Sequence, residues 1–102
     1  MAAELIWSSE SLDAIDAIAE FIARDSPHHA QRVVAALFEL GNAIAAHPLA
    51  GRTVPELNDQ AVRERFLYSY RVIYEVRAER IEMLAVLHGR RLLESIGERF
   101  EE

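Results

Sequence analysis

The chain has 102 residues, of which 51% are hydrophobic and 27% charged, and it contains no cysteine. This length and composition predict one globular domain spanning residues 1–102, and the lack of cysteine excludes disulfides, thiolate metal sites and a thiol nucleophile. No apolar run approaches the roughly 20 residues of a membrane span, and the N-terminus lacks the features of a secretory signal. We therefore expect a cytoplasmic protein that does not interact with membranes.

The formal net charge is −6, and every one of the eleven basic residues is an arginine. Residues 1–50 hold two arginines and seven acidic residues, whereas residues 51–91 hold eight arginines and six acidic residues. Binding to long RNA or DNA strengthens with the number of phosphates that are neutralised. An acidic chain is poorly suited to this, so we expect no strong direct nucleic-acid binding, although a local arginine surface remains compatible with the sequence.

The first 47 residues predict a short strand followed by two helices. Residues 3–7 form a strand-like apolar run, and Ser8 or Ser9 is a suitable N-cap for a helix that ends near Asp25. The apolar stripe of this helix consists of Leu12, Ile15, Ile18, Ala19 and Ile22. Ser26 and Pro27 are typical of a second helix start, and that helix is expected to end at the His47-Pro48 step.

The second helix has its own apolar side, formed by Ala30, Val33, Val34, Leu37, Phe38, Gly41, Ile44 and Ala45. Two antiparallel helices joined by a tight turn form a helical hairpin, and each stripe needs more cover than the other helix provides. A sheet is the natural partner. Residues 47–61 hold two prolines, a glycine and an Asn-Asp pair, which predicts an irregular loop fastened by Leu49, Val54 and Leu57.

From Val62 onward the sequence alternates with period two, which predicts three antiparallel strands. In the first strand, Val62, Phe66 and Tyr68 share one face and Arg63 and Arg65 the other. Residues 70–76 are apolar on one face and mixed on the other, and residues 80–88 are apolar on both faces, which predicts an interior strand. Residues 90–102 predict a short terminal helix, although Gly97 weakens it.

The elements together predict an α+β fold. We expect an N-terminal strand and an antiparallel helical hairpin packed on a small, mainly antiparallel sheet, in the order β-α-α-β-β-β, followed by a short C-terminal helix. The adjacent pair His28 and His29 does not predict a metal site, because neighbouring helical residues point about 100° apart and no further ligands complete a site. No cofactor is predicted, since the chain has no Gly-rich phosphate loop.

Four stretches in this order resemble the ParE branch of the RelE/ParE toxin superfamily: "IWSSESLDAIDAIAEFIARDSP", "HPLAGRTVPE", "YRVIYEV" and "VLHGRR". The resemblance spans nearly the whole chain. It implies the toxin of a type II toxin-antitoxin system, which forms a hetero-oligomer with a cognate ParD-like antitoxin that neutralises it. In the ParE branch the usual target is DNA gyrase, so the resemblance implies a protein that binds gyrase without turning over a substrate.

The RelE branch of the same superfamily implies a different activity, ribosome-dependent cleavage of messenger RNA. That reaction needs groups that accept and donate protons and cations that stabilise the charged phosphorane. Arginine supplies only the cation, because its pKa of above about 12 prevents proton exchange near neutrality. His88 with Arg65 and Arg71 is the candidate set for this alternative. The simpler interpretation is that His88 ends the last strand and that Arg90 and Arg91 pair with Glu64, Glu75 or the acidic tail.

Two groups of residues are candidates for contact with the antitoxin or the target. Arginine forks bind carboxylates and phosphates by two-point hydrogen bonds, and the arginines concerned are Arg63, Arg65, Arg71, Arg90 and Arg91. The apolar stripe near the chain end would be costly to expose without a partner, and it consists of Leu92, Leu93, Ile96 and Phe100. A relative that binds the antitoxin but is no longer toxic would have the same core pattern, so this third interpretation also stays open.

Overall fold

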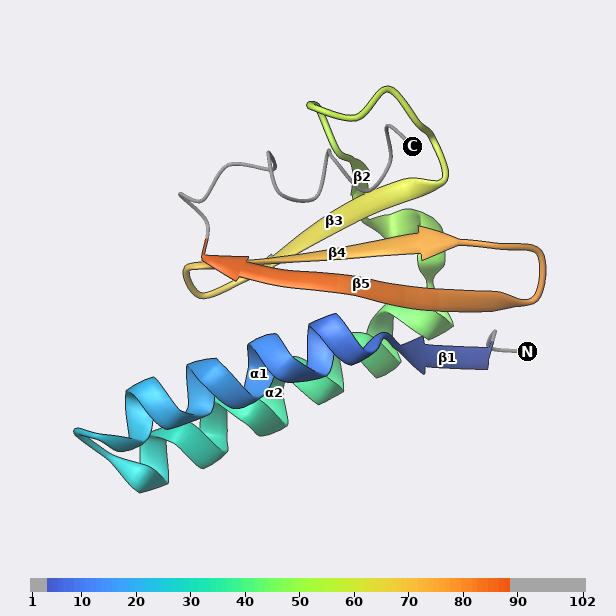
Figure 1. The fold of residues 1–102 in the computed structure, drawn as a ribbon. Coiled ribbons are helices and arrows are strands. Elements are labelled where there is room, and N and C mark those ends of the chain that lie inside the picture. Colours follow the sequence, from blue (N-terminus) through green and yellow to red (C-terminus); the bar gives the residue numbers. More distant parts are fainter. Residues whose placement is uncertain (1–3, 89–102) are drawn as a thin grey trace.

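The computed structural model describes residues 4–88, in which two helices pack on one face of a five-stranded sheet (Figure 1). The elements in chain order are β1 (Glu4–Trp7), α1 (Ser9–Ala23), α2 (Pro27–Ala46), the 3-10 helix η1 (Pro48–Ala50), β2 (Arg52–Thr53), β3 (Val62–Leu67), β4 (Tyr70–Val76) and β5 (Arg80–His88). The predicted α+β class and element order are confirmed. The predicted terminal helix falls outside the described residues.

The strand order in the sheet is β1-β5-β4-β3-β2. β1 runs parallel to β5, and the other neighbouring strands are antiparallel. β5 therefore has a partner on each side, as its apolar faces predict. The two-residue strand β2 was not predicted, because Arg52 and Thr53 lie between a glycine and a proline-containing turn and are too few to form a pattern.

Both helices begin at the predicted serine caps. The Ser8 hydroxyl accepts a hydrogen bond from the Ser11 amide at 3.0 Å, and the Ser26 hydroxyl accepts one from the His29 amide at 3.1 Å. These bonds satisfy amides that have no partner within the helix. Pro27 occupies the first position of α2, where its missing amide hydrogen costs nothing.

One member of the predicted α1 stripe is wrongly placed. Leu12 is 39% exposed, whereas Ser11 is fully buried. The row that faces the sheet is Ser11, Ile15, Ile18 and Ile22, which is about 100° away from Leu12 around the helix. Ser11 tolerates this burial because its hydroxyl donates a hydrogen bond to the Ser8 carbonyl at 2.7 Å.

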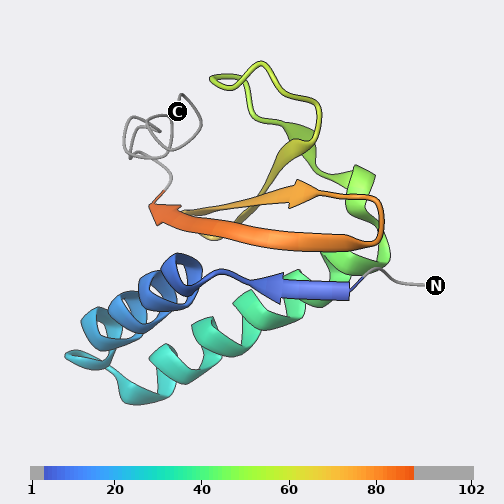
Figure 2. The same cartoon turned by 45° about the vertical axis from the view of Figure 1, so that its right-hand side comes forward.

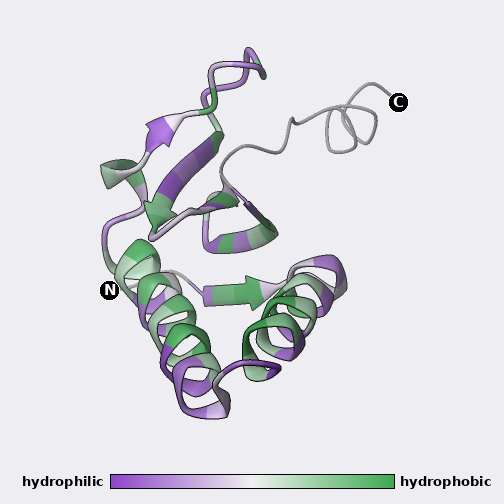
Figure 3. Ribbon diagram, turned by 90° about the vertical axis from the view of Figure 1, so that its left-hand side faces the viewer, coloured by the Kyte–Doolittle hydropathy of each residue, from purple (hydrophilic) through white to green (hydrophobic). Residues whose placement is uncertain are grey.

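The sheet has a hydrophobic cluster on each face. The helix-covered face holds the larger cluster, which includes Ile15, Leu37, Val72, Tyr74 and Met83. The opposite face, which we call the open face, holds Val54, Val62, Ile73, Leu84 and Ala85. Figures 1 and 2 show the helices on one side of the sheet and the 54–61 loop on the other. Figure 3 shows hydrophobic and hydrophilic residues recurring along both helices, with a hydrophilic connection between them.

β5 does not alternate strictly along its length. Tyr74 of β4 pairs with Met83, but the preceding Ile73 pairs with Ala85, so Leu84 is an extra residue that forms a β-bulge. Ile81, Met83 and Val86 consequently pack in the cluster of the helix-covered face, although a strict alternation would put Val86 on the other side. A bulge cannot be read from period two alone, because both faces of this strand are apolar.

The loop that joins α2 to β3 is fastened partly as predicted. Val54 is buried and Leu57 packs against the cluster of the open face, but Leu49 is 68% exposed. Polar contacts fasten its neighbourhood instead, since the Tyr74 hydroxyl donates to the Pro48 carbonyl at 2.7 Å. Tyr68 is likewise exposed, because it lies in the tight β3–β4 turn with a φ of 55° and has left the strand.

Neither helix among residues 4–88 has both the length and the apolar character needed to cross a membrane. This finding agrees with the apolar runs of the sequence, which are all short.

At Gly41, α2 packs closely against the side chains of β1. A Cβ atom at this position would lie 2.5 Å from Cζ2 of Trp7, well inside van der Waals contact. The Trp7 ring is held there by Phe38 of α2, whose ring centroid lies 4.9 Å away in an edge-to-face arrangement. Glycine therefore allows the indole ring to pack directly on the helix backbone.

We expect Gly41→Ala to lower the free energy of unfolding. Overpacking costs about 1–3 kcal/mol, whereas alanine gains only about 1 kcal/mol over glycine inside a helix. Urea unfolding followed by circular dichroism measures the difference. In a Trp7→Leu background the clash is absent, so the same substitution should become neutral or stabilising. A Gly41→Ala protein more stable than the wild type would contradict the packing seen here.

Candidate functional site

The open face of the sheet carries a cluster of four charged side chains, and the buried carboxylate of Glu64 is at its centre. Glu64, in the middle of β3, is only 1% exposed. Its Oε2 accepts a hydrogen bond from Nε of Arg52 on β2, and its Oε1 accepts bonds from Nε and Nη2 of Arg71 on β4. A buried carboxylate is tolerated only when it is paired in this way. Glu64 therefore joins three neighbouring strands.

The fourth member of the charged cluster comes from the loop that follows β2. Glu56 accepts hydrogen bonds from Nη1 and Nη2 of Arg71 at 3.1 and 3.3 Å. Arg71 thus donates hydrogen bonds from Nε and both terminal nitrogens to two carboxylates. Its contact with the two oxygens of Glu56 has the two-point geometry that favours arginine over lysine. The loop is tied to the sheet by this pair and by the side chains of Val54 and Leu57.

The ionisation of the charged cluster follows from these bonds. The hydrogen bond from Arg71 holds the pKa of the Glu56 carboxyl below its usual value, against the opposing effect of partial burial. Burial lowers the pKa of Arg71, but the hydrogen bonds that Arg71 donates to Glu56 and Glu64, together with the charges of these carboxylates, outweigh it and raise that pKa overall. Arg71 therefore stays a cation at every physiological pH, and Glu56 stays an anion near neutrality.

Phe66 lies beside the charged cluster and is 51% exposed. The guanidinium carbon of Arg52 lies 5.5 Å from its ring centroid, and that of Arg71 lies 5.9 Å from it. Both distances fall in the range of cation-π attraction. An exposed aromatic ring with two arginines nearby is a surface suited to contact with another protein, since aromatic and arginine side chains are enriched in such contacts.

The structure divides the predicted arginines between the two faces of the sheet. Arg63 pairs with Tyr74 and Arg65 with Val72, so both belong to the helix-covered face. Arg71 pairs with Phe66 and Leu87, which places it on the open face. Arg65 and Arg71 are therefore not brought together on one surface.

Arg63 makes contacts of a structural kind. Its Nη1 donates to the Gly51 carbonyl at 2.9 Å and reaches the Leu49 carbonyl at 3.5 Å, so it secures the segment between α2 and β2. Tyr74 secures the same segment through Pro48, and burial raises the pKa of its hydroxyl. The hydroxyl is therefore neutral at physiological pH and acts as a hydrogen-bond donor.

His88 is the last residue of β5 and is exposed. It pairs with Tyr70 across the strands, and the two rings lie 6.1 Å apart in an edge-to-face arrangement. Its neighbour Leu87 is the residue that pairs with Arg71. The register thus puts His88 on the same face of the sheet as Arg65 and on the face opposite to Arg71, so the candidate set of His88, Arg65 and Arg71 is split between the two faces.

The remaining predicted contact residues lie outside the described range. These are Arg90, Arg91, Leu92, Leu93, Ile96 and Phe100. Of the acidic partners expected for Arg90 and Arg91, the acidic tail also lies outside this range, whereas Glu64 pairs with Arg52 and Arg71 and Glu75 pairs with Arg77. Among residues 4–88, no group of three or more histidine or acidic side chains is arranged to hold a metal ion.

Sequence reasoning did not identify Glu64, Glu56 and Arg52 as one cluster. The signal for Glu64 was its position between Val62 and Phe66 in the same strand row, where a lone carboxylate among apolar residues implies a buried cation opposite. Glu56 and Arg52 gave no such signal, because they lie in or beside an irregular segment whose path over the sheet has no periodic pattern.

The described residues thus form a small α+β domain with a helical hairpin on a mixed sheet. Its open face carries an internally paired ion cluster and a partly exposed aromatic ring near two arginines. Comparison with protein families gives its class: the model of the ParE toxin of the type II toxin-antitoxin system, parDE, matches residues 5–93. The chain belongs to the ParE toxin family. Among curated proteins no relative matches the chain.

Solved structures share the fold. A chain of the chromosomal ParDE toxin-antitoxin system from P. aeruginosa is 19% identical, with a TM-score of 0.71 over 85% of this chain and 96% of that chain. A chain of the toxin-antitoxin complex RelBE2 from Mycobacterium tuberculosis is 15% identical, with a TM-score of 0.63 over 86% of this chain and 99% of that chain. At these identities the likeness establishes the fold alone.

Loss of Arg71 should destabilise the protein far more than loss of Arg52. Breaking a buried pair leaves an uncompensated charge and costs about 3–5 kcal/mol, whereas an exposed partner contributes about 0–1 kcal/mol. The side chain of Arg71 is buried and that of Arg52 is largely exposed. Urea unfolding of Arg71→Ala and Arg52→Ala at neutral pH compares them. Equal effects of the two substitutions would show that Glu64 does not depend on Arg71.

Proposed function

We propose that this chain is a toxin that a cognate ParD-like antitoxin neutralises in a hetero-oligomer, and that it inhibits DNA gyrase by binding without substrate turnover. The match of the ParE family over residues 5–93 carries the proposal. Gyrase is a cytoplasmic enzyme, so the toxin would act in the cytoplasm. The two similar solved chains come from toxin-antitoxin systems, which supports an antitoxin partner.

The arrangement of the candidate residues favours binding over catalysis. An RNA-cleaving site needs its cations free to face the phosphate, and Arg71 is instead bound by Glu56 and Glu64. It also needs the proton-transferring group on the same surface, and the strand register separates His88 from Arg71. Ribosome-dependent RNA cleavage of the RelE kind therefore ranks second, and an antitoxin-binding relative that is no longer toxic ranks third.

A gyrase assay tests the proposed target. Purified toxin, gyrase and supercoiled plasmid together should give linear DNA that increases with toxin and is absent when either protein is omitted. His88→Ala should retain this effect, because His88 has no chemical role in a binding inhibitor. If gyrase is unaffected at toxin concentrations that arrest growth, RNA cleavage becomes the leading activity. If expression does not arrest growth although the antitoxin binds, the chain is a non-toxic relative.

The predicted contact stripe near the chain end can be tested by truncation. A chain ending at Arg91 lacks Leu92, Leu93, Ile96 and Phe100, and we expect weaker antitoxin binding or weaker toxicity because that apolar surface is lost. The matched control ends at Phe100 and removes only Glu101 and Glu102. Calorimetry and growth assays give the two readouts, and circular dichroism checks the fold. Full retention of both activities in the shorter chain would exclude the stripe from the contact surface.

A further inference from the structure

The loop between β2 and β3 covers part of the open face, and we call its residues 55–60 the strap. Figures 1 and 2 show this loop on the side of the sheet away from the helices. Backbone hydrogen bonds fix both of its ends. The Val54 amide donates to the Val62 carbonyl at 3.3 Å, and the Val76 amide donates to the Ala61 carbonyl at 2.8 Å. The strap is therefore attached to the sheet at each end.

Between these ends, two side chains hold the strap on the sheet. Leu57 packs against the hydrophobic cluster of the open face, and Glu56 accepts two hydrogen bonds from Arg71. The backbone of the strap turns on itself instead, since the Leu57 amide donates to the Val54 carbonyl at 3.1 Å and the Asp59 amide donates to the Leu57 carbonyl at 2.7 Å. One apolar side chain and one ion pair thus fix the middle of the strap.

The ion pair of the strap is exposed on one side only. The Glu56 side chain is 43% exposed, whereas that of Arg71 is 7% exposed. Water can therefore solvate Glu56 when it moves away, and Arg71 keeps the buried Glu64 as a partner. A segment with so few buried contacts opens locally at a lower free energy than the whole protein needs to unfold.

Opening of the strap would uncover an apolar floor beside a cation. The floor belongs to the cluster that includes Ile73 and Leu84, both of which are buried in the closed state. Without the strap carboxylate, Arg52, Arg71 and Glu64 keep two positive charges and one negative charge, so one positive charge stays uncompensated. Such a surface favours a ligand that combines an apolar body with an anionic group.

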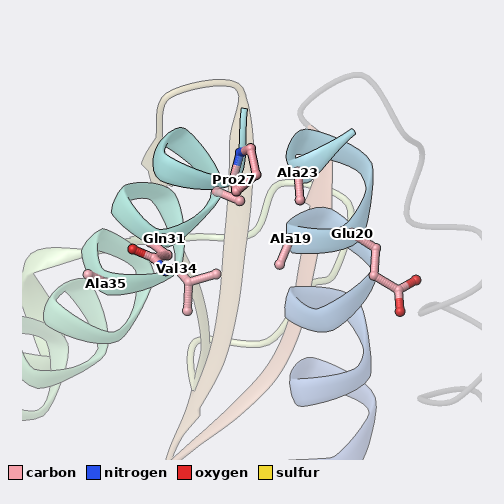
Figure 4. A pocket seen from close by; sticks show the side chains of 8 residues that line it. Ala19, Glu20, Ala23, Pro27, Gln31, Val34 and Ala35 are labelled. Carbon is pink, nitrogen blue, oxygen red and sulfur yellow. The ribbon is translucent and has the colours of Figure 1, made fainter. Parts of the chain in front are cut away.

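The groove of the helical hairpin differs from this covered floor. It occupies about 550 Å³ between α1 and α2, near the turn that joins them, and it is open to solvent. Figure 4 shows Ala19 pointing across the gap toward Val34, while the Glu20 carboxylate points outward at the edge. The residues that line the groove include no cation. Of the two surfaces, the floor beneath the strap is the one that pairs apolar side chains with a positive charge.

We propose that the strap is a lid that opens as one local unit when the Glu56–Arg71 pair breaks, and that it uncovers a binding site for an apolar group carrying an anion. In the closed state Glu56 and Leu57 occupy this site themselves, and they show the ligand chemistry that it accepts: a carboxylate next to an apolar side chain. A ligand competes with the strap, so its apparent affinity is reduced by the fraction of molecules that are open.

Hydrogen exchange of the purified full-length chain, in urea concentrations below its unfolding transition, tests the opening. The amides of Leu57 and Asp59 are hydrogen-bonded in the closed strap. We expect their protection factors to be at least about a hundredfold lower than those of β4 and β5, and nearly independent of urea, because local opening exposes little surface. Equal protection and equal urea dependence in the strap and in these strands would show that the strap opens only by global unfolding, and would overturn the inference.

The role of the Glu56–Arg71 pair is tested by Glu56→Gln, which keeps the size of the side chain and removes its charge. The strap amides should exchange about three- to tenfold faster, because a hydrogen bond to a charged group is replaced by a weaker neutral one. The matched control Glu75→Gln breaks the pair of Glu75 with Arg77, which does not involve the strap, so strap exchange should stay within about twofold of the wild type. Circular dichroism checks that both variants fold. Unchanged strap exchange in Glu56→Gln would mean that the pair does not hold the lid closed.

The site beneath the strap is tested with the dye anilinonaphthalene sulfonate, an apolar ring system that carries an anion. A titration followed by NMR of the Ile73 and Leu84 amides measures binding at the open face. Affinity should rise in Glu56→Gln by the same factor of about three to ten as the opening, and should stay within about twofold in Glu75→Gln. Dye that binds Glu56→Gln no better than the wild type, or that perturbs only the hairpin groove, would exclude the proposed site. Neither measurement contains gyrase or an antitoxin, so failure of the proposed function would leave both results unaffected.

Discussion

The central physical constraint in this protein is the need to cover β5 on both faces. The strand carries Ile81, Met83 and Val86 toward the helices and Leu84 and Ala85 toward the open face, and all five side chains are buried. The helical hairpin covers the first face with two apolar stripes. Among residues 4–88, the segment between β2 and β3 covers the other face, through Val54 and Leu57. A short irregular segment buries little apolar area, so further interactions are needed to hold this segment on the open face.

The charged cluster provides these interactions. Glu64 is held between Arg52 and Arg71, and Arg71 also binds Glu56, so one network connects β2, β3, β4 and the loop. Replacing such a network with apolar residues often stabilises a protein, but removing one partner is costly. The cluster therefore determines where the loop lies more than it adds to stability. The same network occupies Arg71, one of the arginines predicted as contact residues, with two carboxylates of its own chain.

The sequence was sufficient for the elements whose pattern is local. Ser8, Ser26 and Pro27 predicted where the helices begin, and the alternation of apolar and polar residues predicted β3, β4 and β5. Both signals are local, because caps and periodicity depend on neighbouring residues only. The features that were missed depend on contacts across the sheet. The bulge at Leu84 reverses the faces of the residues after it, and the pairing of Glu64 with Arg52 requires knowing that a two-residue strand lies beside β3.

The division of the arginines between the two faces follows from the same register, and it bears on the interpretation of the candidate site. A strand alternates its side chains, so the odd-numbered Arg63 and Arg65 of β3 share a face with the even-numbered Val72 and Tyr74 of β4, and Arg71 takes the other. The bulge then puts His88 with Tyr70. Two surfaces with separate charge patterns result: an open face on which Arg52 and Arg71 pair with acidic side chains, and the outer side of α1, where Asp13, Asp16 and Glu20 form no ion pair among residues 4–88. A protein that acts by contact can use such surfaces for different partners, whereas a catalyst needs its reactive groups to converge.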